Sequence, residues 1–291
     1  MKAVLDTKPT SAYDDDLSQH YQFPRRYRAL MEQSVGDWVV LRRPRADGGN
    51  LAYFATARVI SINPDPNVEG MSYAQLGEYL PFDTPVPWQV NKRYAEEALR
   101  KLPITQVGLY LRGRSVRTLS NEDFLDLITL GFPKTLELQM SQDQSSDPLP
   151  EKVRRVESKL TNRVIREASF RRTICEAYDS RCAVTRLRIL DRQGNAEAQA
   201  AHIWAVSNGG PDLVQNGIAL SATVHWLFDR HLISISDDHK LLVADKLIPA
   251  ELRASFAQHG GNILLPSNTA MWPHSAYLAR HRAMFTAQST N

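Results

Sequence analysis

The sequence predicts an α+β protein of two domains, with strands in its first part and helices in its second. Its 291 residues exceed the roughly 150 of a typical domain. Alternating apolar runs before residue 139 predict strands, and apolar residues at three- and four-residue steps after residue 152 predict helices. A polar stretch with two prolines separates them and predicts a linker. We therefore expect domains at 1–138 and 153–291, joined through 139–152.

The composition is that of an ordinary soluble protein, with 43% hydrophobic and 23% charged residues. No apolar run reaches the roughly 18 residues of a membrane helix, so we expect no membrane partner. Met1 to Ser11 has no apolar core, which argues against a secretory signal. Cys175 and Cys182 are too few for a disulfide framework. Together these features predict a cytoplasmic protein.

The charge is unevenly divided along the chain. Residues 1–150 hold 17 Lys+Arg and 19 Asp+Glu, whereas 151–291 hold 18 and 13. The excess lies in 151–192, with 12 basic and 6 acidic residues. Such a segment is weak support for a polyanion partner. On charge alone, a solvated helix face is the favoured interpretation.

The elements of the first domain follow from local pattern. A turn at Val35–Asp37 leads into a strand, and a second strand follows a glycine pair that fits a hairpin loop. Ser120, with Asp123 three residues later, resembles a capping box at a helix start. Gly131 and Pro133 end that helix at about Leu130. The expected strands are 38–41, 53–62 and 107–111, with the hairpin loop at Gly48 and Gly49.

The second domain begins with helices and continues as a mixture of strands and loops. Val153, Val156, Leu160 and Val164 recur at helical spacing. A Gly- and Asn-rich loop at 207–215 separates two apolar strands. The expected elements are a first helix from 153 to 164, a second at 170–178, strands at 198–205 and 217–220, a helix from about 221, and a hairpin of 232–235 with 241–243.

Four polar residues in this half have ordered spacing. His225 and Asp229 stand at i and i+4, so they share one helix face and can bind one cation together. Nitrogen and oxygen ligands suit Mg²⁺ or Mn²⁺ better than a thiolate site would. His202 ends a strand just before the loop, where it can face a substrate. The Asn216 amide begins the next strand and can hold the loop in place.

This strand–loop–strand–helix pattern, from Cys182 to Asp229, resembles the HNH nuclease family with its ββα-metal fold. The resemblance implies that His202 is the general base that activates water and that Asn216 orients the loop and the base. It also implies that His225 and Asp229 hold a divalent metal, Mg²⁺ or Mn²⁺.

One position departs from the family pattern. Many members carry a metal-binding Asp or His immediately before the first histidine, and here that position is Ala201. Three alternatives stay open: the site is metal-poor, it recruits another carboxylate such as Glu197 or Asp212, or it relies on phosphate and water. When each site residue is considered alone, a structural role in the core, in a turn or in a helix cap also explains it. The two cysteines, which form no CxxC pair, are expected to be a buried thiol and a helix residue rather than zinc ligands.

The first domain resembles the PUA-like superfamily of small β-barrels, which includes EVE, ASCH and SRA-type modules. The resemblance rests on short motifs at 21–27, 35–38, 53–62, 79–82 and 86–87. It implies a barrel with flanking helices that binds a modified base, often after base flipping.

A flipped base needs aromatic faces for stacking and a polar group for its edge. The predicted pocket residues are Tyr21, Phe23, Trp38, Asp37 and Trp88. The predicted phosphate contacts are Arg112, Arg114 and Arg117. The alternatives are core packing for the aromatic residues and a solvated strand edge for the arginines.

A PUA-like reader joined to an HNH nuclease resembles a modification-dependent, type IV restriction endonuclease. The expected substrate is double-stranded DNA that carries 5-methylcytosine or 5-hydroxymethylcytosine. One HNH site cuts one strand, so cutting both strands needs a homodimer or two binding events. Two alternatives stay open, namely an inactive reader of modified nucleic acid and a non-specific HNH nickase. The segment from Gly260 onward is either a packed helix or a dimer contact.

Overall fold

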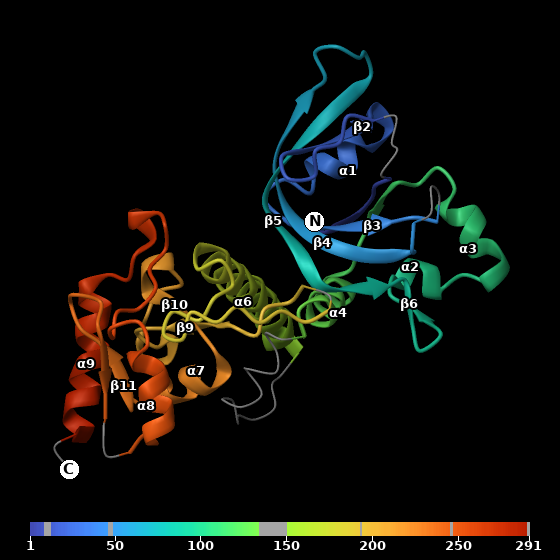
Figure 1. Ribbon diagram of the computed structural model, residues 1–291. Helices are drawn as coiled ribbons and strands as arrows, with labels where there is room; N and C mark the ends of the chain where they lie inside the picture. Colours follow the sequence, from blue (N-terminus) through green and yellow to red (C-terminus); the bar gives the residue numbers. More distant parts are fainter. Residues whose placement is uncertain (9–12, 46–48, 134–149, 193, 245–246, 290–291) are drawn as a thin grey trace. The chain divides into compact units, whose positions relative to one another are not determined.

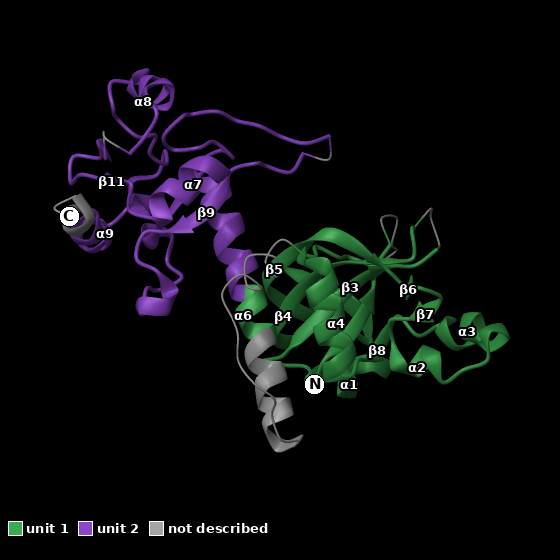
Figure 2. Ribbon diagram, turned by 90° about the horizontal axis from the view of Figure 1, so that it is seen from below, with its two compact units in different colours: residues 1–165 green, residues 166–291 purple. Residues whose placement is uncertain are grey.

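The computed structural model describes all 291 residues except 9–12, 46–48, 134–149, 193, 245–246 and 290–291. The chain separates into two compact units, Met1–Ile165 (unit 1) and Arg166–Asn291 (unit 2) (Figures 1 and 2). Each unit has its own cluster of buried apolar side chains. Most of the predicted linker, 139–152, lies outside the described residues, and helix α6 (Pro150–Ala177) begins at its end.

Unit 1 is built on one curled sheet of six strands (Figure 1). All neighbouring strands are antiparallel except β1 and β3, which are parallel. Among the described residues the sheet is open, with β2 and β8 at its edges, so the predicted β-barrel is a half-barrel. In sheet order the strands are β2 (His20–Pro24), β5 (Met71–Pro87), β4 (Ala52–Pro64), β3 (Trp38–Arg43), β1 (Ala3–Asp6) and β8 (Val116–Thr118).

The curl follows from the long pair β4 and β5. Their register shifts at three places, between Tyr53 and Ala55, Thr56 and Arg58, and Val59 and Ser61. Such irregularities increase twist and bend a ribbon. One face buries apolar side chains that include Leu5, Phe23 and Val39. The short elements around the sheet are α1 (Arg28–Glu32), β6 (Gln89–Val90), β7 (Arg93–Tyr94), α2 (Glu97–Arg100), α3 (Ile104–Leu111) and α4 (Asn121–Gly131).

Most local predictions for unit 1 are confirmed. The predicted strands at 38–41 and 53–62 are β3 and β4. The Ser120 hydroxyl accepts a hydrogen bond from the Asp123 backbone N–H at 3.0 Å, which caps α4. The predicted strand at 107–111 is wrong, because this segment belongs to helix α3. The helix begins after Pro103, and only Val107 of its eight residues is buried. A short apolar run is compatible with either a strand or a helix, and the prediction chose the wrong one.

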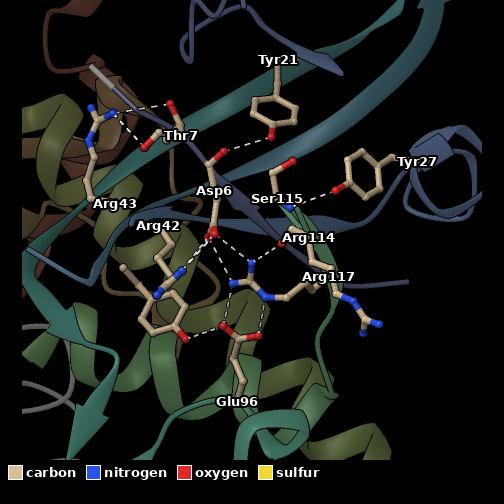
Figure 3. A network of polar contacts seen from close by, with 11 residues as sticks. Asp6, Thr7, Tyr21, Tyr27, Arg42, Arg43, Glu96, Arg114, Ser115 and Arg117 are labelled. Carbon is tan, nitrogen blue, oxygen red and sulfur yellow. Dashed lines mark hydrogen bonds and ion pairs between the residues drawn. The ribbon is translucent and has the colours of Figure 1, made fainter. Parts of the chain in front are cut away.

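A network of buried ion pairs joins the strands of unit 1 to the segment before α2 (Figure 3). Arg117 donates to both oxygens of Glu96, at 2.8 and 2.9 Å, and to Asp6 at 3.0 and 3.1 Å. Arg42 donates to Asp6 at 3.0 Å, and the Tyr53 hydroxyl donates to Glu96 at 2.8 Å. Burial by itself would raise the pKa of Glu96, but the contacts with Arg117 lower it below its ordinary value. The opposite charges therefore stabilise one another inside the unit.

Unit 2 places a small antiparallel strand pair between helices (Figure 1). The predicted strand at 217–220 and the hairpin of 232–235 with 241–243 are confirmed. The two predicted helices at 153–164 and 170–178 are one helix, α6, since no helix breaker lies between them. The further elements are β9 (Gln199–His202), β10 (Gly217–Leu220), α7 (Ala222–Asp229), β11 (Ile233–Ile235), β12 (Leu241–Val243), α8 (Ala250–Ala257) and α9 (Ser275–Ser289).

Helix α6 lies close to β10 because Gly217 leaves room for it. A Cβ on this glycine would stand 2.2 Å from the Ile174 side chain and 2.8 Å from that of Phe170. Ile174 and Phe170 are buried in the core of unit 2. The close approach fixes the end of α6 against the strands that carry the polar residues of the predicted site.

The C-terminal helix α9 is packed into unit 2. Its His281 is buried, stacks on Phe228 at 3.7 Å between ring centroids, and shares a hydrogen bond with Ser234 at 2.9 Å. Cys175 lies in α6 and Cys182 is buried, as predicted, and neither forms a disulfide. Within the described residues, no helix is long and apolar enough to span a membrane.

Candidate active site

His202 is held in place on two sides. It is the last residue of β9 and pairs across the sheet with Gly217. Its ring stacks on Phe170 of α6, with 3.9 Å between centroids and 7° between planes. Its Nε2 lies 2.9 Å from Oδ1 of Asp212, and both side chains are 18% exposed. The imidazole therefore sits at the surface with a fixed ring plane.

The two carboxylates that the sequence offered as substitute metal ligands have other partners. The second oxygen of Asp212 lies 3.3 Å from Nε of Arg166. Glu197 accepts a hydrogen bond from the Ala222 backbone N–H at 2.8 Å, at the start of α7. Ala201 is fully buried in the core, so the position before His202 faces the interior. An ionised side chain there would lose its hydration.

Asn216 holds the loop between β9 and β10. Its Oδ1 accepts from the Trp204 backbone N–H at 2.9 Å. Its Nδ2 donates to the carbonyl oxygens of Trp204 and Pro211, at 3.0 and 2.9 Å. The side chain is fully buried, and both of its polar atoms are satisfied by backbone groups of one loop. This arrangement fits the expected loop-orienting role.

His225 and Asp229 lie one turn apart on α7, with 3.4 Å between Nε2 and Oδ2. The other imidazole nitrogen, Nδ1, lies 2.9 Å from Oε1 of Gln199 on β9. An amide oxygen only accepts, so Nδ1 carries the proton and Nε2 keeps its lone pair. Gln199 thus fixes the tautomer that a metal ligand needs, a supporting role that the sequence analysis missed.

The electrostatics of the site favour a neutral His225. Burial lowers its pKa below the ordinary value, the nearby charge of Asp229 opposes this shift, and the charge of His202 adds to it. A neutral imidazole with a free Nε2 and an adjacent carboxylate are suitable donors for a divalent ion. No group of three or more His, Cys, Asp or Glu residues gathers for metal binding within the described ranges. Among the described residues, the candidate metal site therefore consists of His225 and Asp229 alone.

The predicted reader residues of unit 1 have diverse surroundings. Tyr21 and Phe23 are buried core residues of β2, and the Tyr21 hydroxyl donates to the Asp6 carbonyl at 3.0 Å. A base-stacking role for these two residues therefore does not fit the structure. Trp38 is almost fully buried, and the carboxylate of Asp37 pairs with Lys2 at 2.5 Å. Core packing explains the three aromatic side chains.

Trp88 and two of the arginines remain accessible. Trp88 is half-buried and meets the ring of Tyr94 edge-on at 5.1 Å. Arg112 and Arg114 are exposed at the surface. Arg117 is instead buried between Glu96 and Asp6, with both carboxylates bound (Figure 3). It is an internal ion-pair partner rather than a phosphate contact.

Comparison with known protein families identifies the part of unit 2 that carries the site. Residues 182–236 match the model of an HNH endonuclease family. This part of the chain is an HNH endonuclease domain. The match includes His202, Asn216, His225 and Asp229, while Phe170 and the rest of α6 lie before it.

Solved structures give weaker likenesses. A modification-dependent TagI restriction endonuclease is 12% identical with a TM-score of 0.32, covering 96% of this chain and 80% of its own. Rpa0253 from Rhodopseudomonas palustris is 14% identical with a TM-score of 0.32, covering 45% of this chain and 92% of its own. The type IV phosphorothioation-dependent restriction endonuclease ScoMcrA is 14% identical with a TM-score of 0.23, covering 100% of this chain and 51% of its own. Likenesses this low identify no function for this chain. No curated protein sequence matches it.

Proposed function

We propose that this protein is a metal-dependent endonuclease that cuts double-stranded DNA carrying a modified cytosine. The observation that supports the nuclease part is that His202 and the His225–Asp229 pair lie within one HNH endonuclease match, and that Gln199, on the same strand as His202, contacts His225. The Nε2 of His202 is occupied by Asp212, and none of the hydrogen bonds among the described residues involves its Nδ1.

The proposed reaction is hydrolysis of a phosphodiester. The His202 Nδ1 accepts a proton from water while the water oxygen forms a bond to phosphorus. The bond between phosphorus and the departing sugar oxygen breaks, and that oxygen takes a proton from solvent. The protonated imidazole then releases its proton to water. Asn216 keeps the loop after β9 in the shape that presents His202.

The metal site in this proposal consists of His225 Nε2 and the Asp229 carboxylate. A divalent ion held there, Mg²⁺ or Mn²⁺, would supply positive charge that stabilises the charge developing on the phosphate during hydrolysis. Gln199 keeps the proton on Nδ1 of His225 and so keeps Nε2 available. The Asp229 side chain is 54% exposed, so a divalent ion could reach it from solvent.

Unit 1 is the proposed reader of the modified base. This part of the proposal rests on the resemblance of its motifs to PUA-like modules and on its compact fold, separate from the HNH domain. Trp88 offers a half-buried aromatic face, and Arg112 and Arg114 offer exposed charges for phosphates. In this arrangement the reader selects the DNA and the HNH domain cuts nearby. A homodimer, or two successive binding events, completes a double-strand break.

A cleavage assay tests both parts of the proposal. Supercoiled plasmids of one sequence, carrying cytosine, 5-methylcytosine or 5-hydroxymethylcytosine, are incubated with the protein and Mg²⁺ or Mn²⁺. We expect nicking of modified plasmids only, its loss in His202→Ala, and a raised metal requirement in Asp229→Asn. Glu176→Gln, an exposed substitution on α6, is the matched control.

The other outcomes separate the alternatives. Equal cutting of all three plasmids would retain the nuclease and remove the reader, which is the non-specific nickase of the sequence analysis. Tight binding of modified DNA without cutting under either metal would favour the inactive reader. A double variant, Arg112→Gln with Arg114→Gln, should weaken DNA binding in a salt-dependent way if these side chains contact phosphates.

A further inference from the structure

We propose that Asp212 is the positioning residue for His202. Its carboxylate holds the imidazole in the tautomer whose proton is on Nε2 and whose free lone pair is on Nδ1. This inference rests on the proposed function of His202 as general base, and it assigns to Asp212 a role in that same site.

The geometry fixes the direction of the hydrogen bond. A carboxylate accepts and does not donate, so the 2.9 Å contact requires His202 Nε2 to carry the proton. Stacking on Phe170 at 3.9 Å holds the ring plane, so the imidazole cannot turn its other nitrogen toward Asp212 without losing this packing. The nitrogen left for a water molecule is Nδ1. When this nitrogen accepts a proton, the Asp212 charge stabilises the resulting imidazolium.

The second oxygen of Asp212 also has a defined partner. Arg166 on α6 places Nε 3.3 Å from Oδ2, and a guanidinium only donates. The loop that carries Asp212 is tied to Asn216 through the Pro211 carbonyl at 2.9 Å. Asp212 is therefore oriented by a neighbouring backbone contact on one side and by Arg166 on the other.

The competing role for Asp212 is that of the metal ligand missing at Ala201. Its two oxygens instead face Nε2 of His202 and Nε of Arg166. Within the part of the chain that the structure describes, it forms no cluster with two other metal-binding side chains. The contacts favour positioning of the base over metal binding.

The two roles respond differently to Asp212→Asn. Arg166 favours the side-chain orientation in which it faces the amide oxygen, because a guanidinium and an amide NH₂ are both donors. The Nδ2 group then faces His202 and donates to Nε2, which moves the imidazole proton to Nδ1 and removes the base. Asp212→Glu keeps a carboxylate that can accept from Nε2. A lost metal ligand would instead raise the metal concentration needed for activity.

The test combines kinetics with a direct measurement of the tautomer in the full chain. Nicking kcat and KM, with the Mg²⁺ dependence, are measured for wild type, Asp212→Asn, Asp212→Glu and the Glu176→Gln control. The ¹⁵N shifts of the His202 ring in histidine-labelled protein, assigned with His202→Ala, report which nitrogen carries the proton. Backbone amide spectra show whether each variant is folded.

We expect Asp212→Asn to lower kcat by about 100-fold or more, with KM and the Mg²⁺ midpoint within about twofold of wild type. The ¹⁵N shifts should show the proton moved from Nε2 to Nδ1, and Asp212→Glu should keep the wild-type tautomer and recover part of kcat. An unchanged tautomer in a folded Asp212→Asn, or a higher Mg²⁺ midpoint at unchanged kcat, would overturn the proposal. If the wild type cuts no DNA, the proposed function fails, and the tautomer measurement alone still decides the link between Asp212 and His202.

Discussion

Replacing Asn216 by alanine is expected to open the loop that presents His202. The side chain makes three hydrogen bonds to backbone groups of Trp204 and Pro211, at 2.9 to 3.0 Å, and it is fully buried. Each such bond contributes about 0.5–1.5 kcal/mol net, and the three partners would be left unpaired. The free energy of unfolding of this region should therefore fall by about 2–4 kcal/mol.

Asn216→Asp is the shape-matched comparison. It keeps one acceptor for the Trp204 N–H, but it places a second oxygen about 3 Å from the carbonyl oxygens of Trp204 and Pro211. These acceptor–acceptor contacts, together with a buried charge, should make aspartate at least as destabilising as alanine.

The assay is hydrogen exchange followed by mass spectrometry, because the chain has two units and a single unfolding transition is not guaranteed. Peptides that cover 203–216 should lose protection first, and peptides of unit 1 should not change. Nicking activity should fall in parallel. The reasoning would be refuted if Asn216→Ala lowered the free energy of unfolding by less than about 1 kcal/mol and the loop of Asn216→Asp exchanged at the wild-type rate.

Three other predictions follow from buried contacts. Glu96→Gln turns an amide NH₂ toward Arg117 and should destabilise unit 1 by about 3 kcal/mol, seen as faster exchange in unit 1 while unit 2 is unchanged. Burial and the charge of His231 lower the pKa of His281 from 6.5 to about 4. Between these pH values the unfolded state therefore binds a proton that the folded state does not. The free energy of unfolding of unit 2 should fall by about 3 kcal/mol as the pH is lowered from 6.5 to 4. In unfolding measured as a function of pH, His281→Gln should lack this dependence. Gly217→Ala, which drives a methyl group into Ile174, should cost about 1–3 kcal/mol in thermal unfolding and slow nicking by displacing α6.

Local sequence pattern was a good guide where the determinant was itself local. The Ser120 cap, the strand at 217–220 and the turn between β11 and β12 depend on residues a few positions apart, and all three are confirmed. The apolar run at 107–111 could not distinguish a strand from a helix, because short apolar runs occur in both. The helix that contains this run starts directly after Pro103, a residue that is tolerated at helix starts.

Burial in unit 1 could not be predicted from residue type. Tyr21 and Arg117 suggested base stacking and phosphate binding, yet both are interior. The reason is non-local, since Arg117 meets Asp6, which lies far away in sequence, only because β1 pairs with β8. A single arginine gives no sign of whether the fold will bring carboxylates to it.

The supporting residues of the site were hidden for the same reason. His202, Asn216, His225 and Asp229 follow a recognisable order, but Gln199 and Phe170 belong to no spacing rule. Gln199 shares a strand with His202 and reaches His225 only through the packing of β9 against α7.

The compact core that contains the HNH match therefore extends beyond the residues that match the family model. That match begins at 182, whereas Phe170 and Ile174 of helix α6, and Tyr178 directly after it, are almost fully buried in the same core as Ala201 and Ile218. Burying side chains of this size stabilises a fold by about 1.5–3 kcal/mol each, so the three together contribute about 5–9 kcal/mol. This is comparable to the whole stability of a typical domain, about 5–15 kcal/mol. Because Phe170 also stacks on the proposed base, the helix that completes the core is the same element that sets the plane of the His202 ring.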